Sequence, residues 1–146
     1  MKNYFAVIGL VVSLLLIATS GLAAERDITL SRVPAEELEK AKAMKNPIPA
    51  TPENIAKGKE LFEGKGTCFT CHGTSGKGDG DAGKALDPSP RDFTNPAFHK
   101  LRTDGEMFWV IKNGSSGTGM ISYAPAIISD EEAWTIINYE RSFGKK

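Results

Sequence analysis

Apolar residues at helical spacing follow a clear helix-start signal just after residue 50. Thr51-Pro52 joins a favourable helix cap to a proline suited to the first helical position. The helix is predicted to run to about Glu63, because Gly64 is a typical helix end. Its inward face would carry Ile55, Gly58 and Phe62.

Two further helices are predicted from capping boxes, in which a Ser or Thr is followed three residues later by Glu. One opens at Thr103 and runs through Lys112, and the other runs from Asp130, after Ser129, to about Ser142. A single helical turn is expected after Asn95. The inward residues of the two long helices would be Met107, Val110 and Ile111, then Ala133, Ile136, Ile137 and Tyr139. No stretch alternates cleanly like a strand, so the prediction is a small all-α domain with long loops.

The N-terminus has a different pattern, with one early lysine and then an uncharged stretch from Tyr4 to Ala24. This is typical of a secretory signal peptide, and cleavage after Ala23 would place small residues at the recognised positions. The stretch also approaches the length that spans a bilayer. Residues 1–24 are therefore interpreted as a signal peptide or an N-terminal membrane anchor. Either predicts export, to the bacterial periplasm, as a soluble protein or one tethered through residues 4–24.

Residues 25–50 form an extension or linker before the domain at 51–146. A short helix is expected within Ser31 to Met44, and Asn46 to Ala50, with its two prolines, favours an extended path. Two interpretations stay open: a strap lying on the domain, or a spacer from a membrane anchor.

The charge balance excludes one class of partner. The chain has 18 basic and 18 acidic residues, and removal of residues 1–24 takes away only Lys2, leaving 17 against 18. No strongly basic face is expected, so nucleic acid is not a predicted partner. The length fits one domain.

Cys68-Phe69-Thr70-Cys71-His72 spells C-x-x-C-H, the attachment signal for a covalent c-type haem. Each thiol can add to one haem vinyl group, and His72 would then lie beneath the iron. A thioredoxin-like pair would open a helix, but a glycine-rich loop from Gly73 to Gly83 follows. Zinc would need His99 as a remote fourth ligand, and a disulfide would close a very small loop. Asp79 and Asp81 lack the further ligands of a calcium loop. One haem per chain is the prediction.

The ligand on the other face of the iron decides whether such a protein carries electrons or binds small molecules. The sequence offers Met44, His99, Met107 and Met120. Met107 is interpreted as a core residue and His99 as a surface residue, since each sits in a pattern typical of that role. Met120 is favoured as the ligand, because it ends a loop of small residues, Gly114 to Gly119, that can approach a flat ring closely.

Taken together, these residues resemble the class I monohaem cytochromes c, the mitochondrial-type and bacterial family. The resemblance covers about Thr51 to Phe143 and includes Ala56 to Phe62, Cys68 to His72, Gly117 to Met120 and Trp134 to Arg141. It implies that the first and last helices cross, with Gly58 and Phe62 against Ile136 and Tyr139. It also implies that a proline carbonyl, of Pro88 or Pro90, accepts a hydrogen bond from His72. Many relatives have proline directly after the ligand methionine, where this chain has Ile121.

The resemblance implies a one-electron carrier rather than an enzyme, with Cys68 and Cys71 bound to the haem and His72 and Met120 bound to its iron. Its partners would be other redox proteins, met in transient contacts. Two alternatives are kept: a cytochrome subunit of a larger respiratory oxidoreductase complex, and an open-site haem enzyme or gas-binding protein.

Overall fold

The computed structural model describes residues 28–145 of the chain. The predicted signal peptide or anchor at residues 1–24 lies outside the described residues. Among residues 28–145, no helix is both long and apolar enough to cross a membrane.

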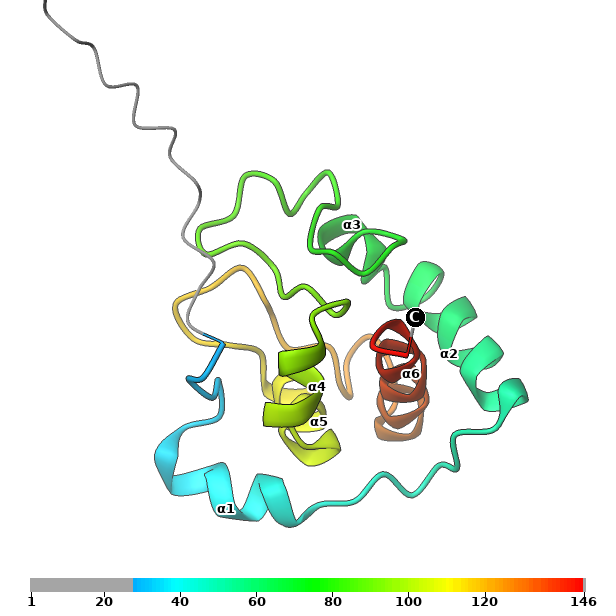
Figure 1. The fold of residues 1–146 in the computed structure, drawn as a ribbon, viewed down its shortest axis with the longest axis horizontal. Helices are drawn as coiled ribbons and strands as arrows, with labels where there is room; N and C mark the ends of the chain where they lie inside the picture. The colour runs from blue at the N-terminus through cyan, green and yellow to red at the C-terminus, as the bar shows by residue number, and fades with distance from the viewer. Residues whose placement is uncertain (1–27, 146) are drawn as a thin grey trace, which may run out of the picture.

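The described part of the chain folds into α-helices joined by long loops and contains no strand (Figure 1). The all-α prediction is therefore confirmed. The helices are α1 (Ala35–Ala43), α2 (Pro52–Glu63), α3 (Phe69–His72), α4 (Pro96–Leu101), α5 (Asp104–Asn113) and α6 (Asp130–Phe143).

The helices begin where the predicted capping residues stand. The Thr51 hydroxyl accepts a hydrogen bond from the Asn54 amide at the start of α2. Thr103 and Ser129 each form a complete capping box at the start of α5 and α6. Asn95 caps α4 through the Ala97 amide. Because each cap satisfies amides that have no partner inside the helix, these starts are determined locally.

Helices α2 and α6 pack against each other in close contact (Figure 1). Gly58 makes this possible, since a Cβ there would collide with the Thr135 carbonyl oxygen and lie 3.0 Å from the Tyr139 Cβ. One turn later, Phe62 is fully buried and its ring meets the Tyr139 ring edge-on, with centroids 5.4 Å apart. The predicted crossing of the first and last helices of the domain is confirmed.

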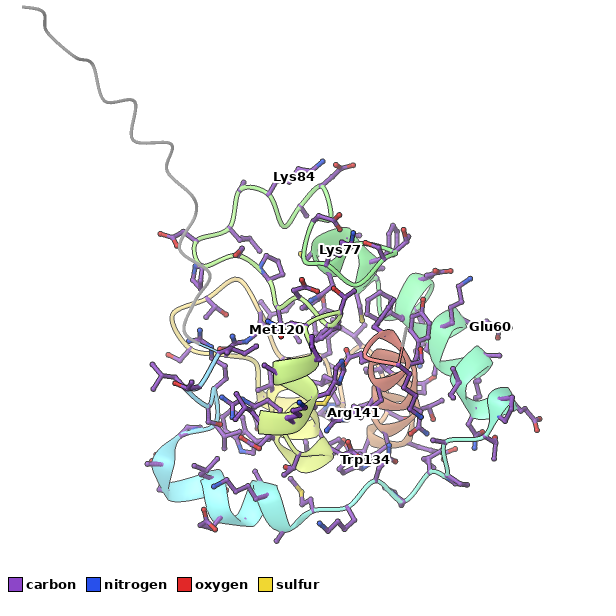
Figure 2. The ribbon with its side chains drawn as sticks, viewed as in Figure 1. Glu60, Lys77, Lys84, Met120, Trp134 and Arg141 are labelled. Carbon is purple, nitrogen blue, oxygen red and sulfur yellow. The ribbon has the colours of Figure 1, made fainter. Side chains whose placement is uncertain are left out.

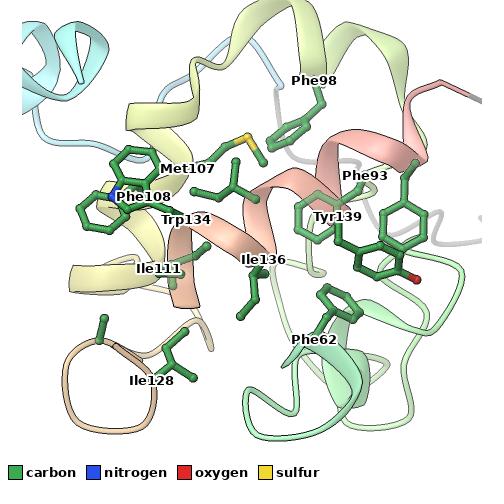
Figure 3. Close-up of a cluster of buried hydrophobic side chains, with 14 residues drawn as sticks. Phe62, Phe93, Phe98, Met107, Phe108, Ile111, Ile128, Trp134, Ile136 and Tyr139 are labelled. Atoms are coloured by element: carbon green, nitrogen blue, oxygen red, sulfur yellow. The ribbon is translucent and has the colours of Figure 1, made fainter. Parts of the chain in front are cut away.

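The hydrophobic core spreads from this crossing to the inner face of α5 (Figure 3). Phe108 on α5 stacks on Trp134 on α6, with ring centroids 4.0 Å apart and an interplanar angle of 3°. Ile136 and Ile137 are completely buried, as the apolar pattern of α6 predicts. Each such side chain contributes about 1.5–3 kcal/mol by leaving water, so this core fixes α5 relative to α6.

Residues 28–50, hereafter the strap, lie along the domain. The buried Ala41 on α1 packs so closely on α5 that a Cβ at Gly105 would collide with its carbonyl oxygen. Farther on, the Asn46 side chain donates to the Trp134 carbonyl at 3.0 Å and to the Asn138 side chain at 3.1 Å. Asn138 in turn donates to the Ile48 carbonyl at 3.0 Å. Hydrogen bonds and a buried helix face thus hold the strap to α5 and α6.

Candidate functional site

A largely apolar cavity opens between α3, α5, α6 and the loops around them. Its empty space is about 1200 Å³, counting the open mouth. Its walls include Cys68, Cys71 and His72 of the C-x-x-C-H motif. They also include Met120, the methionine predicted to bind the iron. The fold thus brings these four residues to one cavity.

The motif itself forms the one-turn helix α3. Cys68 precedes the helix, and its carbonyl accepts the His72 amide at 2.9 Å. Both cysteines are free thiols on the cavity wall. Burial raises the pKa of Cys68 to about 12, with the negative charge of Glu140 adding to the effect. A thiol that stays protonated is a weak nucleophile, which argues against a role for Cys68 in thiol–disulfide exchange.

His72 is held by a backbone carbonyl and an aromatic ring. Its Nδ1 lies 3.2 Å from the Arg91 carbonyl oxygen, and its ring stacks on Phe93 with centroids 4.6 Å apart. The prediction that a carbonyl of Pro88 or Pro90 meets His72 is therefore wrong. The carbonyl belongs to Arg91, the residue after Pro90, because the turn directs that carbonyl toward the imidazole ring. Burial lowers the pKa of His72 to about 4, so the imidazole is neutral and Nε2 can bind a metal.

The glycine-rich loop after α3 has a role that its sequence did not reveal. Its amides satisfy the carbonyls at the end of the motif: Gly78 donates to His72 at 2.9 Å, and Gly80 donates to Cys71 at 3.1 Å. A Cβ at Gly83 would collide with the Cys71 carbonyl oxygen. Glycine is required here because the loop backbone lies directly against α3. Figure 2 shows the exposed Lys77 on this loop and the exposed Lys84 directly after it.

The loop glycines therefore support the motif, whereas Asp79 and Asp81 make local contacts. Asp81 pairs with Lys84 at 2.6 Å in solvent, and Asp79 accepts a hydrogen bond from Ser75 at 3.4 Å. Within residues 28–145, no group of acidic, cysteine or histidine side chains is arranged to hold a metal ion by itself.

Met120 reaches the cavity from a hydrogen-bonded turn (Figure 2). Its amide donates to the Thr118 hydroxyl at 3.0 Å, and its carbonyl accepts the Ser115 amide at 2.8 Å. Gly114 and Gly117 adopt positive φ values of 78° and 70°, which close the turn. Bonds on both sides of Met120 fix its backbone beside the cavity.

The other candidate ligands differ in how the fold uses them. Met107 is 6% exposed within the core cluster and also lines the cavity (Figure 3). Met44 packs against the core from the strap and does not line the cavity. His99 is half-buried, with Nε2 2.6 Å from the Phe93 carbonyl oxygen and Nδ1 3.2 Å from Arg141. Both nitrogens of His99 are therefore occupied within the protein.

Basic side chains gather where the strap meets the cavity. Arg91 donates to the Leu30 carbonyl at 3.4 Å, and Arg102 donates to the Ile28 carbonyl at 2.7 Å. Both arginines line the cavity, together with Arg32 of the strap. This part of the wall would stabilise negative groups on a bound molecule.

These features fit a covalently bound c-type haem. The cavity offers two thiols, a neutral imidazole with an oriented ring, two methionine sulfurs and mostly apolar walls. Its arginines suit the two carboxylates of such a cofactor, while its apolar surface suits the flat ring. Cys68 and Cys71 would hold the group covalently, and His72 would bind its iron.

Comparison with known proteins identifies a matching family and a similar solved structure. The family model described as Cytochrome c matches residues 55–143. The chain also resembles a solved structure of the Kuenenia stuttgartiensis reducing HAO-like protein complex Kustc0457/Kustc0458, with a TM-score of 0.58 and 30% sequence identity. That match covers 68% of this chain but only 49% of the other, so the chain spans about half of that protein's length. No curated protein sequence matches significantly.

Proposed function

Because the chain belongs to the cytochrome c family, which supports haem-based electron transfer, we propose that it is a one-electron carrier. Its single haem is held covalently by Cys68 and Cys71, with His72 and Met120 as the axial ligands of the iron. The observation that carries this proposal is the convergence of these four residues on one largely apolar cavity.

The haem would supply an iron that cycles between the ferric and ferrous states. The protein tunes that iron through its ligands and surroundings. The Arg91 carbonyl orients the His72 ring and makes it a stronger donor. A thioether sulfur from Met120 favours the ferrous state relative to a second histidine. The hydrogen bonds on both sides of Met120 would keep this ligand in place in both oxidation states.

The proposed partners are other redox proteins, met in brief contacts after export to the periplasm. Residues 1–24 would direct that export or retain the protein at the membrane. A second candidate function is that of a subunit in a larger oxidoreductase complex, because the similar solved structure is a complex of two named proteins. Purification of the native protein under mild conditions separates these functions: a stable stoichiometric partner supports the subunit, and a monohaem protein eluting alone supports the free carrier.

An absorption spectrum of the purified full-length protein in both oxidation states tests the proposed ligands. A weak far-red band typical of methionine-ligated ferric haem is expected. Two methionines line the cavity, so Met120→Leu and Met107→Leu form a matched pair of similar volume. The band should disappear in Met120→Leu and persist in Met107→Leu. The opposite result would identify Met107 as the methionine ligand of the iron.

Two further measurements test the attachment and the closed iron site. Haem should remain with the protein after acid-acetone extraction, and Cys68→Ala or Cys71→Ala should lower the yield of haem protein. Full yields of stable haem protein from both variants would contradict attachment through two thioethers. Slow carbon monoxide binding by the native ferrous protein is expected, whereas rapid binding would favour an open-site enzyme or gas-binding protein.

A further inference from the structure

Glu140 on α6 is a buried carboxyl group in the wall of the cavity. Glu140 is only 5% exposed, even though it lines the open cavity. Among residues 28–145, no side chain or amide lies within hydrogen-bonding or ion-pairing distance of its carboxylate. Since its oxygens are neither bonded nor enclosed by protein, they face the cavity.

The neighbouring acidic residue in the cavity is in a different situation. Glu106 accepts hydrogen bonds from the Ser31 hydroxyl at 2.9 Å and the Thr103 amide at 2.9 Å, and lies 3.5 Å from Arg102. Its negative charge is thus stabilised by the protein. Glu140 has no such partner in the described part of the chain, and an isolated buried carboxylate is costly unless it takes up a proton.

Arg141, the next residue on α6, does not neutralise Glu140. Its guanidinium donates to Asp104 at 2.7 Å, to the Arg102 carbonyl at 2.6 Å and to the His99 carbonyl at 3.2 Å. Arg141 is therefore directed to α4 and α5. Glu140 instead lies close enough to Cys68 for its charge to raise the pKa of that thiol.

Cys68 is a proposed attachment point, so Glu140 would lie beside the bound haem. Ferric haem carries one more positive charge than ferrous haem. A nearby positive charge favours the ionised carboxylate, and its loss favours the protonated acid. The proton affinity of Glu140 must therefore depend on the oxidation state of the iron.

On the basis of the electron-carrier function above, we propose that Glu140 couples proton uptake to reduction of the haem. As one electron enters from a redox partner and converts Fe(III) to Fe(II), the Glu140 carboxylate takes one proton from water and becomes a neutral carboxylic acid. Oxidation returns the electron to a partner and the proton to water. One negative and one positive charge enter together, so the net charge of the site is unchanged.

Several other groups share the cavity with Glu140 and contribute to its electrostatics. From the strap, the loops and α3 to α5 these are Arg32, Arg91, Arg102, Glu106, Cys68, Cys71, His72 and Tyr123. Helix α2, which also packs against α6, contributes no charged residue to the described lining. Glu140 is distinguished within this set as the carboxyl without a protein partner. Burial raises its pKa to about 8, with Arg141 acting in the opposite direction, which brings its titration near neutral pH.

The test is the reduction potential of the full-length haem protein, measured spectroelectrochemically from about pH 5 to about pH 10. For a one-electron couple, each tenfold fall in proton concentration lowers the potential by up to about 59 mV when one proton accompanies the electron. The wild-type potential should fall with pH across part of this range. Glu140→Gln should lose this slope, match the wild type at acidic pH and lie above it at alkaline pH.

Two variants make the result specific. Glu131→Gln removes a carboxylate from an exposed position on the same helix and should retain the wild-type slope. Glu140→Asp should retain a slope with a shifted midpoint pH. A wild-type potential that is flat over the range, or a Glu140→Gln slope equal to the wild type, would overturn the proposal.

If Glu140→Gln does not bind haem, infrared spectroscopy of the wild-type protein still tests the proposal. Electrochemical reduction of the wild type should produce a carboxylic acid band that moves in Glu140→Asp. Absence of such a band, or a band unchanged in Glu140→Asp, would overturn the proposal. The absence of any reversible one-electron couple would overturn the electron-carrier function itself, whereas a reversible couple without this pH dependence would overturn only the role of Glu140.

Discussion

The crossing of α2 and α6 rests on the absence of a side chain at Gly58, and Gly58→Ala tests this directly. The added methyl group would meet the Thr135 carbonyl oxygen and lie 3.0 Å from the Tyr139 Cβ. Both are backbone or backbone-attached atoms, which no rotamer change can move. The two helices must separate, and separation loosens the packing of the fully buried Phe62 against Tyr139.

Two effects of opposite sign determine the magnitude. Replacing glycine by alanine inside a helix favours folding by about 1 kcal/mol. Overpacking usually costs about 1–3 kcal/mol, and a backbone obstacle places this case near about 3 kcal/mol. The expected net destabilisation is about 2 kcal/mol. For a domain of this size, that corresponds to a fall in Tm of roughly 8 °C.

Thermal and chemical denaturation of the haem protein, followed by helical circular dichroism, measures this change. Ala56→Gly provides the control, since Ala56 is exposed on the same helix. It should destabilise the protein by about 1 kcal/mol through helix propensity alone. If propensity alone governed α2, Gly58→Ala would raise Tm. A Gly58→Ala protein as stable as the wild type, or more stable, would refute the packing argument.

Three further predictions concern the core, the strap and the loop below the motif. Phe62→Ala should cost about 3–5 kcal/mol because its ring is fully buried, and a loss below about 1 kcal/mol in denaturant titration would contradict this. Asn46→Ala removes two hydrogen bonds to α6 and should speed amide hydrogen exchange at residues 44–50, so unchanged exchange would show that the strap is held elsewhere. Gly83→Ala should lower the yield of haem protein, because the new Cβ would collide with the Cys71 carbonyl oxygen. The control Lys84→Ala, at an exposed position, should leave the yield unchanged. Equal yields from the two variants would contradict the supporting role of the loop.

The helices were predictable because their start signals are local. The caps at Thr51, Thr103 and Ser129 each act on the amide three residues on, so they operate whatever the rest of the chain does. The crossing of α2 and α6 was predicted from the family resemblance, and Gly58 is the residue that permits it. Membership of the cytochrome c family was likewise readable in the sequence, since the motif and both helices stand in family order.

The surroundings of the motif were not predictable in the same way. The carbonyl that meets His72 belongs to Arg91 because of the path taken by the turn containing Pro88 and Pro90, and a sequence does not specify that path to one residue. The glycines after α3 indicated a loop, but not that its amides would bind the carbonyls of Cys71 and His72. Such contacts depend on where two flexible segments meet.

The sequence by itself determined the helices, the attachment motif and the family, because caps, apolar spacing and the closely spaced cysteines act over a few residues. Only the tertiary structure decided that residues 28–50 lie along the domain, that Met107 shares the cavity with Met120, and that the carboxyl of Glu140 faces that cavity without a partner among residues 28–145. A glutamate on a helix is ordinarily exposed. On α6 it is buried in the wall of the cavity, on a helix that also packs against α2 and α5.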